Sequence, residues 1–308
     1  MVTFVRDPVC VNGVFLVPKS DQKWRLIIDA QSANVHFSPP PHVELPSPSN
    51  LAGLICDRPF YVAKMDLDNY YHRLSLPDSY HRYFGLPSVR AGDISGELAA
   101  MFGEDTIVFP CCTTLPMGWS HSVFLAHSGH LNILSEAGIR AGQIFVNKPV
   151  TRVSEDPVHL PYIDDLNTFG TEPHLISADM ERVRLAYGRK GLVVKESKCV
   201  GPCSVTEVLG LEADGAARMV GLSHAKLHAL HDRITSFLER QAVSGKELAA
   251  LLGSLTWAAL VRRPLLSVFR SAYRFVHTAG DRTLPLWPSV CRELVAARGL
   301  LPLFFASL

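Results

Sequence analysis

The chain has 308 residues, of which 47% are hydrophobic and 19% are charged, and its formal net charge is +1. This composition excludes a disordered chain and predicts a globular protein large enough for more than one lobe. The cysteines are scattered, the N-terminus lacks a signal-peptide core, and the apolar runs are shorter than a membrane span. These features favour an intracellular protein, cytoplasmic or nuclear, without a membrane segment.

In chain order, apolar periodicity and turn residues predict strands at 14–18 and 24–28, joined by a turn at 19–23, and then an extended loop at 38–49. A strand at 60–67 and a short helix or turn at 68–76 follow. The next elements are a Gly-rich surface excursion at 87–105, a strand at 106–114 and an amphipathic helix at 120–137. A hairpin, a helix and two further strands are expected next, at 158–162, 166–170, 179–190, 192–194 and 208–211.

Beyond Arg218 the pattern becomes helical. Apolar spacing predicts helices at 223–241, 244–260 and 265–277. Ser244 and Glu247 form a capping box at the start of the second, and Pro264 suits the first turn of the third. The fold class is therefore α+β, with a mixed region followed by a helical one.

The charges are unevenly distributed along the chain. Residues 218–298 contain 12 Lys/Arg and 5 Asp/Glu, whereas the rest contains 18 Lys/Arg and 24 Asp/Glu. A basic C-terminal third beside an acidic remainder suits a protein that binds a polyanion. Solvated helix faces are the alternative explanation.

Three carboxylates lie at the ends of predicted strands. Asp66 ends the strand at 60–67, and Asp164 and Asp165 form the turn of the hairpin, in the sequence Tyr162-Ile163-Asp164-Asp165. A two-metal phosphoryl-transfer site needs such oxygen ligands, held so that the ions lie about 4 Å apart. A surface turn with two solvated aspartates is the alternative for the tetrapeptide alone.

Five segments resemble, in the same order, the polymerase motifs of reverse transcriptases. They are residues 23–29 with Asn34, 64–72, 115–120, 162–165 and 191–199, and residues 208–211 resemble the primer-grip strand pair. The resemblance covers most of residues 14–260. It implies that Asp66, the Leu67 carbonyl, Asp164 and Asp165 hold two Mg²⁺ ions, with Mn²⁺ as an alternative.

The resemblance also assigns substrate-binding residues. Lys23 and Arg25 share one face of a strand and would hold the incoming triphosphate, although solvated strand residues would look the same. Tyr71 falls on the steric gate that selects deoxynucleotides, with a core aromatic as the alternative. Met117 and Gly118 match the template and nucleotide platform.

Two positions need a further choice. Lys198 matches the lysine that protonates the pyrophosphate leaving group in the family, with Lys195 as a competitor and a solvated lysine as the alternative. Tyr70 departs from the family, where a small residue is usual.

The resemblance implies a right-hand polymerase architecture, truncated at both ends. Fingers are expected at 1–60 and 77–112, a palm with an antiparallel sheet at 61–76 and 113–218, and a helical thumb at 219–280. Residues 281–308 would be a linker toward an absent ribonuclease H-like domain of a longer polyprotein. The helical tail is similar to DIRS-like and LTR-type retroelement enzymes.

The implied function is that of an RNA-directed DNA polymerase of a retrotransposon-like element. Its partners would be an RNA or DNA template with its primer, and dNTP. A catalytically inactive nucleic-acid-binding remnant is the first alternative. An RNA-templated RNA polymerase is the second, which Tyr71 disfavours.

Overall fold

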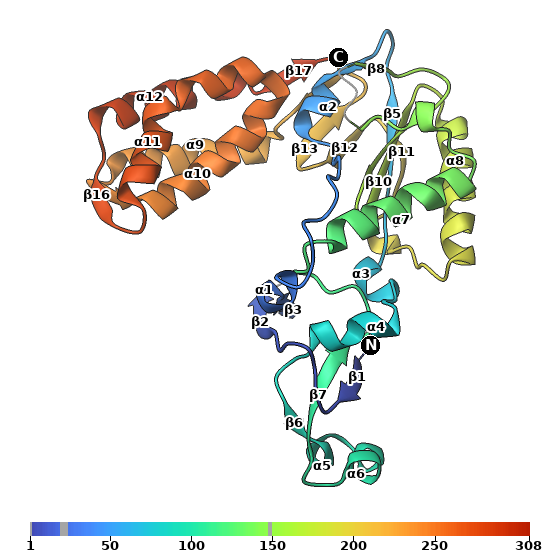
Figure 1. Ribbon diagram of the computed structural model, residues 1–308. Coiled ribbons are helices and arrows are strands. Elements are labelled where there is room, and N and C mark those ends of the chain that lie inside the picture. Colours follow the sequence, from blue (N-terminus) through green and yellow to red (C-terminus); the bar gives the residue numbers. More distant parts are fainter. Residues whose placement is uncertain (1, 19–23, 147–149) are drawn as a thin grey trace.

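A computed structural model describes residues 2–18, 24–146 and 150–308. Figure 1 shows an elongated molecule in which a central sheet lies between two lobes. One lobe consists of the C-terminal helices, and the other carries the N-terminal strands and a small helical tip. Within these described ranges, no helix is long and apolar enough to cross a membrane.

The central sheet has the order β11-β5-β10-β9, with every pair antiparallel. Its strands are β5 (Tyr61–Asp66), β9 (Val158–Tyr162), β10 (Asp165–Gly170) and β11 (Val200–Cys203). Met65 and Leu166 face one core cluster, which includes residues of α7 (Ser122–Glu136) and α8 (Pro173–Arg189). Val62 and Phe169 face a second cluster on the opposite side, because strand side chains alternate between faces. The sheet is therefore buried on both sides, with α7 and α8 on one of them.

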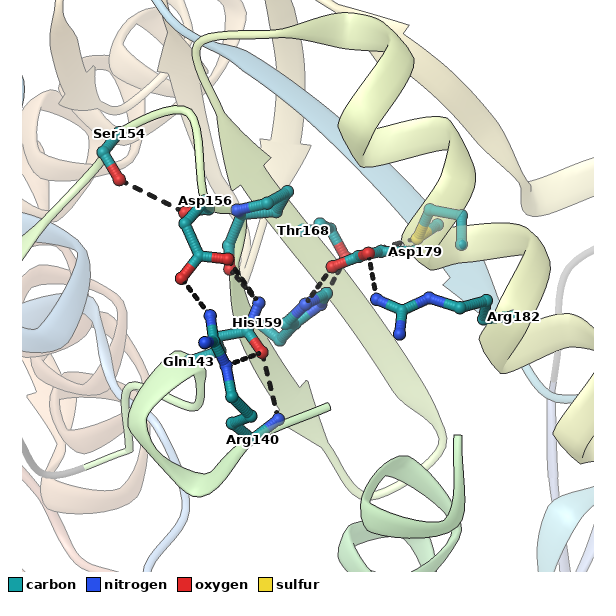
Figure 2. A network of polar contacts seen from close by, with 10 residues as sticks. Arg140, Gln143, Ser154, Asp156, His159, Thr168, Asp179 and Arg182 are labelled. Carbon is teal, nitrogen blue, oxygen red and sulfur yellow. Dashed lines mark hydrogen bonds and ion pairs between the residues drawn. The ribbon is translucent and has the colours of Figure 1, made fainter. Parts of the chain in front are cut away.

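A buried polar network ties α8 to the hairpin of β9 and β10 (Figure 2). The His159 ring bonds Thr168 Oγ1 at 3.0 Å and Asp179 Oδ2 at 3.1 Å, and Asp179 also accepts from Arg182. Burial opposes ionisation of Asp179, but the hydrogen bonds from His159 and Arg182 outweigh it and lower the pKa of that carboxyl. Because His159 is fully buried, this Thr-His-Asp arrangement supports the fold and is closed to any substrate.

The N-terminal lobe contains a β1-β7-β6 sheet and the β2-β3 hairpin. Its strands are β1 (Val2–Val5), β2 (Gly13–Pro18), β3 (Trp24–Asp29), β6 (Val89–Arg90) and β7 (Ile107–Cys112). Its short helices, and those that lead into and out of β5, are α1 (Gln31–Asn34), α2 (Pro48–Ala52), α3 (Tyr70–Arg73), α4 (Asp78–His81), η1 (Arg82–Phe84), α5 (Ala91–Ile94) and α6 (Gly96–Phe102). A small parallel pair, β4 (Leu54–Ile55) with β8 (Thr151–Arg152), lies beside the central sheet.

The C-terminal lobe packs four helices around an apolar core of its own within the described chain. They are α9 (His224–Glu239), α10 (Gly245–Ala259), α11 (Arg270–Ala279) and α12 (Pro288–Leu300). A second sheet, of order β12-β13-β14-β17, joins this lobe to the rest. Its strands are β12 (Val205–Val208), β13 (Leu211–Asp214), β14 (Met219–Gly221) and β17 (Phe305–Ser307). The remaining elements are η2 (Ala141–Gln143), η3 (Glu196–Lys198), β15 (Ala242–Ser244), η4 (Leu260–Val268), β16 (Thr283–Pro285) and η5 (Leu301–Leu303).

Most predicted elements are confirmed, including both strands of each hairpin and the capping box of Ser244 and Glu247. The excursion at 87–105 is largely helical, since α5 and α6 lie there. The segment at 192–194 forms only an isolated bridge between Val194 and Leu67, and 208–211 is the turn of the β12-β13 hairpin.

Three further boundaries differ in the helical regions. Helix α8 begins at Pro173, six residues before the predicted start, because proline is well suited to the first turn. Pro264 lies inside the kinked η4 segment, and α11 starts only at Arg270. Residues 288–303 form α12 and η5, which contribute to the core of the C-terminal lobe, and β17 pairs with β14 in the second sheet. Residues beyond the predicted boundary at 280 thus share a core with the helices before it.

Candidate active site

The sheet brings the three predicted carboxylates together. Asp66 ends β5, Asp165 begins β10, and their Cα atoms are register partners. Residues directly opposite each other share a face of the sheet, so both carboxylates project from the same side. Asp66 is buried, with 5% of its surface exposed, and Asp164 lies in the adjoining turn. Two residues far apart in sequence thus meet through antiparallel pairing.

The turn that carries Asp164 is conformationally strained. Tyr162 and Asp165 are the last paired residues of β9 and β10, so Ile163 and Asp164 form a two-residue connection. Ile163 has a φ of 57°, in the left-handed region that a β-branched residue adopts at a cost of about 1–3 kcal/mol. The Asp164 carbonyl accepts a hydrogen bond of 3.0 Å from the Leu67 N–H, which links the turn to the end of β5.

Crowding of negative charge perturbs the aspartates. The pKa of Asp165 is raised to about 7, chiefly by burial and further by the nearby Asp66 and Asp164. The positive charge of Lys64 acts in the opposite direction. Burial also raises the pKa of Asp164, and Asp66 adds to it, while Lys198 and Arg25 act in the other direction. The carboxyl oxygen Oδ1 of Asp165 is buried without a hydrogen-bond partner in the described part of the chain.

This donor set suits a hard divalent cation. Carboxylate and carbonyl oxygens are the ligands that Mg²⁺ prefers, and a cation would relieve both the charge crowding and the unpaired Asp165 oxygen. In the described ranges, no group of three or more His, Cys, Asp or Glu side chains is already gathered at metal-binding distances. The ammonium of Lys198 instead contacts Asp66, so the residues fit the ion chemically but would have to rearrange to hold it.

Lys198 is the lysine that reaches the carboxylates. Its Nζ atom donates to Asp66 Oδ1 at 2.8 Å from the short helix η3. That hydrogen bond raises the pKa of the Lys198 ammonium, with further support from Asp165 and Asp164. Lys195 also lines the cavity, and its backbone N–H donates to the Asp66 carbonyl at 2.8 Å.

A cavity of about 380 Å³ opens in front of the carboxylates. Nine of the residues singled out from the sequence line it, namely Arg25, Asp66, Leu67, Tyr70, Tyr71, Met117, Asp164, Lys195 and Lys198, whereas Asp165 does not. Trp24, Leu26 and His72 also line it; they lie within the motif segments 23–29 and 64–72, but sequence reasoning assigned them no role of their own. Lys23 lies outside the described residues.

The tandem tyrosines have different environments. Tyr71 is half-buried at the cavity, and burial, with smaller effects of Asp164 and Tyr162, raises its pKa to about 12. Tyr70 is 2% exposed, and its hydroxyl donates to the Ala126 carbonyl of α7 at 2.9 Å. Tyr70 therefore fills the core beneath the site, which accounts for a bulky residue at this position.

Gly118 serves the fold rather than the cavity wall. Its φ is 123°, and a Cβ atom there would lie 2.2 Å from the Ile28 carbonyl oxygen at the end of β3. The Asn34 side chain brackets the same loop, donating to the Gly118 carbonyl at 3.2 Å and accepting from the Ser120 N–H at 2.9 Å. Gly118 does not line the cavity itself, and its neighbour Met117 does. The resemblance assigned Gly118 to a template and nucleotide platform, and in the structure its close contact is with the Ile28 backbone.

Sequence reasoning missed the groups that support the carboxylates. Lys64 lies two residues before Asp66, and its Nζ atom is 3.9 Å from Asp165 Oδ2. His127 and His130 of α7 bond the backbone of Ile163. Two histidines spaced three apart on one face of an amphipathic helix were the available signal, but nothing in that spacing indicates their target.

Comparison with known proteins supports the fold. No family model and no curated protein match the sequence. The foamy viral protease–reverse transcriptase dRH in complex with double-stranded DNA is similar, with a TM-score of 0.67 and 19% identity over 97% of this chain and 45% of that one. A second structure, of the foamy viral protease–reverse transcriptase with double-stranded DNA, has a TM-score of 0.64 and 18% identity, and covers 97% of this chain and 53% of that one.

A third structure, of the foamy viral enzyme with an RNA/DNA hybrid, gives a TM-score of 0.64 and 17% identity, and covers 97% of this chain and 34% of that one. The chain thus spans about half or less of the length of these viral proteins. At such low identity the likeness concerns the path of the chain and not its chemistry. The chain has a reverse-transcriptase-like fold.

Proposed function

We propose that the protein is an RNA-directed DNA polymerase that transfers nucleotides from dNTP to a primer 3′-hydroxyl. The observation that carries the proposal is the register pairing of Asp66 with Asp165, together with a cavity that is lined by Asp66, Asp164, Arg25 and Lys198. Nucleotidyl transfer needs carboxylates, cations and an open cavity at one place. The reverse-transcriptase-like fold adds to this support.

In this reading the described lobes take the roles of a right hand. The central sheet would be the palm, the N-terminal strands the fingers, and the C-terminal helices the thumb. The β2-β3 hairpin would then close over the triphosphate, with Arg25 contributing its planar guanidinium fork to the phosphate oxygens. The relatives named above were solved with nucleic acid bound, which fits a template and primer as partners here.

Asp66, Asp164, Asp165 and the Leu67 carbonyl would hold two Mg²⁺ ions, or Mn²⁺ in their place. When bound, such ions supply charge neutralisation for the phosphates and activation of the primer hydroxyl. Lys64 lies close enough to Asp165 to hold that carboxylate in place. The raised pKa of Asp165 means that part of this charge is absent at neutral pH until a cation compensates it.

Lys198 would provide the proton for the leaving pyrophosphate. The new bond forms between the primer 3′-oxygen and the α-phosphorus, and the bond from that phosphorus to pyrophosphate breaks. Because Asp66 raises the pKa of Lys198, its ammonium is fully protonated at neutral pH and has a proton to give. Lys198→Ala should lower kcat more than it changes KM for dNTP.

Tyr71 would act as the steric gate. It is half-buried, and its neighbour Tyr70 is locked into the core by a bond to α7, so the backbone under Tyr71 is firmly supported. A bulky ring at that wall would clash with a ribose 2′-hydroxyl. Tyr71→Ala should therefore increase incorporation of ribonucleotides relative to deoxynucleotides, and an unchanged ratio would remove the gate assignment.

The helical lobe would track the duplex backbone. A groove of about 590 Å³ between α9 and α10 is lined by Lys226, Arg233 and Trp257. Cationic side chains beside an aromatic ring suit a nucleic-acid backbone, and binding of this kind weakens steadily as salt rises. Charge reversal at Arg233 should weaken binding to every primer–template by a similar factor.

The deciding test is primer extension on poly(rA)/oligo(dT) with dTTP and Mg²⁺. Asp164→Asn should abolish extension while primer–template binding persists. Asp105→Asn serves as the matched control, because that carboxylate belongs to a side chain that is 91% exposed and far along the chain from the site. Binding without extension by the wild type would point instead to the inactive nucleic-acid-binding remnant.

A further inference from the structure

Two histidines of α7 bond the backbone N–H and the backbone carbonyl of Ile163, which lie in the two peptide units on either side of its Cα. The Ile163 N–H donates to His127 Nδ1 at 3.4 Å, and His130 Nδ1 bonds the Ile163 carbonyl at 2.8 Å. His127 is 2% exposed and His130 is fully buried. Both polar groups of the strained residue are therefore engaged from the helix side of the sheet.

The hydrogen bonds determine which nitrogen of each ring carries the proton. His127 Nδ1 accepts, so a neutral His127 carries its proton on Nε2. His130 Nδ1 must donate to a carbonyl, so its Nε2 accepts from the Tyr187 hydroxyl at 2.5 Å. Tyr187 is a fully buried residue of α8. The Ile163 carbonyl thus sets the tautomer of His130, and the Tyr187 hydroxyl satisfies the other ring nitrogen, so the two helices act on the turn together.

Both rings are neutral at physiological pH. Burial lowers the pKa of His130 to about 4, with a smaller opposing effect of the Ile163 carbonyl, and burial also lowers the pKa of His127. They therefore support the turn without adding positive charge that would compete with a cation for the aspartates.

This arrangement is unfavourable for stability taken alone. His127 Nε2 is buried and has no hydrogen-bond partner among the described residues, and Ile163 keeps a positive φ. Buried groups that lack partners and strained backbone are both destabilising, and both here lie at the same turn. The hydrogen bonds of both histidines meet at the backbone of Ile163, the residue before Asp164.

We propose that His127 and His130 are positioning residues that hold the Ile163 backbone, on both sides of its Cα, so that Asp164 and Asp165 stay aligned with Asp66. Tyr187 supports the second of them. The inference rests on the proposed polymerase function for its catalytic consequence, but the hold on the turn itself can be measured without activity. Misplacement of a reacting group by about 1 Å lowers a rate by about a hundredfold.

The test uses substitutions that keep or remove one nitrogen position. The amide of Asn lies near the Nδ1 position of a histidine ring, whereas that of Gln lies near Nε2. His130→Asn should therefore retain a donor to Ile163, and His130→Gln should lose it. We expect single-turnover extension to fall by about a hundredfold in His130→Gln and much less in His130→Asn, with unchanged primer–template affinity.

His159→Gln is the matched control. His159 is an equally buried, doubly bonded histidine of β9 whose partners lie away from the turn (Figure 2). His159→Gln should lower Tm as His130→Gln does, while its rate of extension per folded molecule stays within about threefold of the wild-type rate. Equal losses of rate in the two Gln variants, or no rescue by His130→Asn, would overturn the positioning role.

Amide exchange of Ile163, followed by NMR, is the second readout. Removing the acceptor in His127→Leu should speed exchange of that amide by about tenfold, which is the effect of losing one hydrogen bond, and His159→Gln should leave it unchanged. If the wild type does not extend primers, the proposed function fails. The comparison of Ile163 amide exchange in the wild type and the variants still tests whether the histidines hold the turn. Equal exchange in His127→Leu and the wild type would refute it.

Discussion

Replacing Asp165 with Asn should make the protein more stable at alkaline pH, although it removes one carboxylate of the proposed site. Asp165 is 28% exposed at its side chain, and its pKa rises from 3.8 to about 7 on folding, chiefly through burial. A shift of about three units corresponds to about 4 kcal/mol at roughly 1.4 kcal/mol per unit. Loss of the partner of Lys64 returns about 1 kcal/mol, so we expect a net gain of roughly 3 kcal/mol at pH 8.

The sign follows from proton binding. Between pH 4 and pH 7 the folded protein binds the Asp165 proton and the unfolded chain does not, so the wild type loses stability as pH rises through this window. The Asn variant lacks this loss. The difference in unfolding free energy should thus be near zero at pH 4 and reach its full value above pH 7.

Urea denaturation of both proteins at pH 4, 6 and 8 measures this difference. Asp105→Asn, at an exposed carboxylate, should show no such pH-dependent gain. Mg²⁺ at pH 8 should stabilise the wild type more than the Asn variant, because it compensates the charge that the variant has lost. A gap that stayed constant across pH, or a variant less stable than the wild type at pH 8, would refute the burial argument.

Three other substitutions test separate parts of the structure. Gly118→Ala should lower the unfolding free energy by more than about 2 kcal/mol, because the added Cβ would lie 2.2 Å from the Ile28 carbonyl oxygen. Thermal unfolding measures this loss, and a smaller loss would contradict the steric argument. Glu293→Gln should destabilise by about 1–3 kcal/mol, because that carboxylate accepts two backbone N–H groups at the start of α11 at 2.8 Å each; an unchanged urea midpoint would contradict this. Lys198→Arg should retain more primer extension than Lys198→Ala, since arginine, like lysine, keeps a positive charge near Asp66. Equal rates in the two variants would argue against a role for that charge.

Local sequence patterns predicted the elements that depend on nearby residues. The hairpin around Asp164 follows from two apolar segments with a short polar turn, and the start of α10 follows from the capping box of Ser244 and Glu247. The nearness of Asp66 to Asp164 came from the resemblance to a family, because strand periodicity alone does not pair strands that are a hundred residues apart.

Other features depend on contacts that no local pattern encodes. Pro264 fits a helix start by itself, yet packing of the C-terminal lobe delays α11 to Arg270. Tyr70 reads as an anomaly beside Tyr71 until its hydroxyl is seen to bond α7. A side chain's role in such cases depends on what the rest of the chain brings against it.

The sequence by itself determined the α+β order of elements, the strand ends that carry aspartates, and the basic character of the C-terminal third, since these follow from residue type and spacing. Tertiary structure alone decided that Lys198 rather than Lys195 contacts Asp66 through its side chain, that Gly118 packs against backbone, and that His127 and His130 hold Ile163. The physical reason is distance: each of these contacts joins residues more than thirty positions apart, and only the packed chain brings their atoms within hydrogen-bonding or van der Waals range.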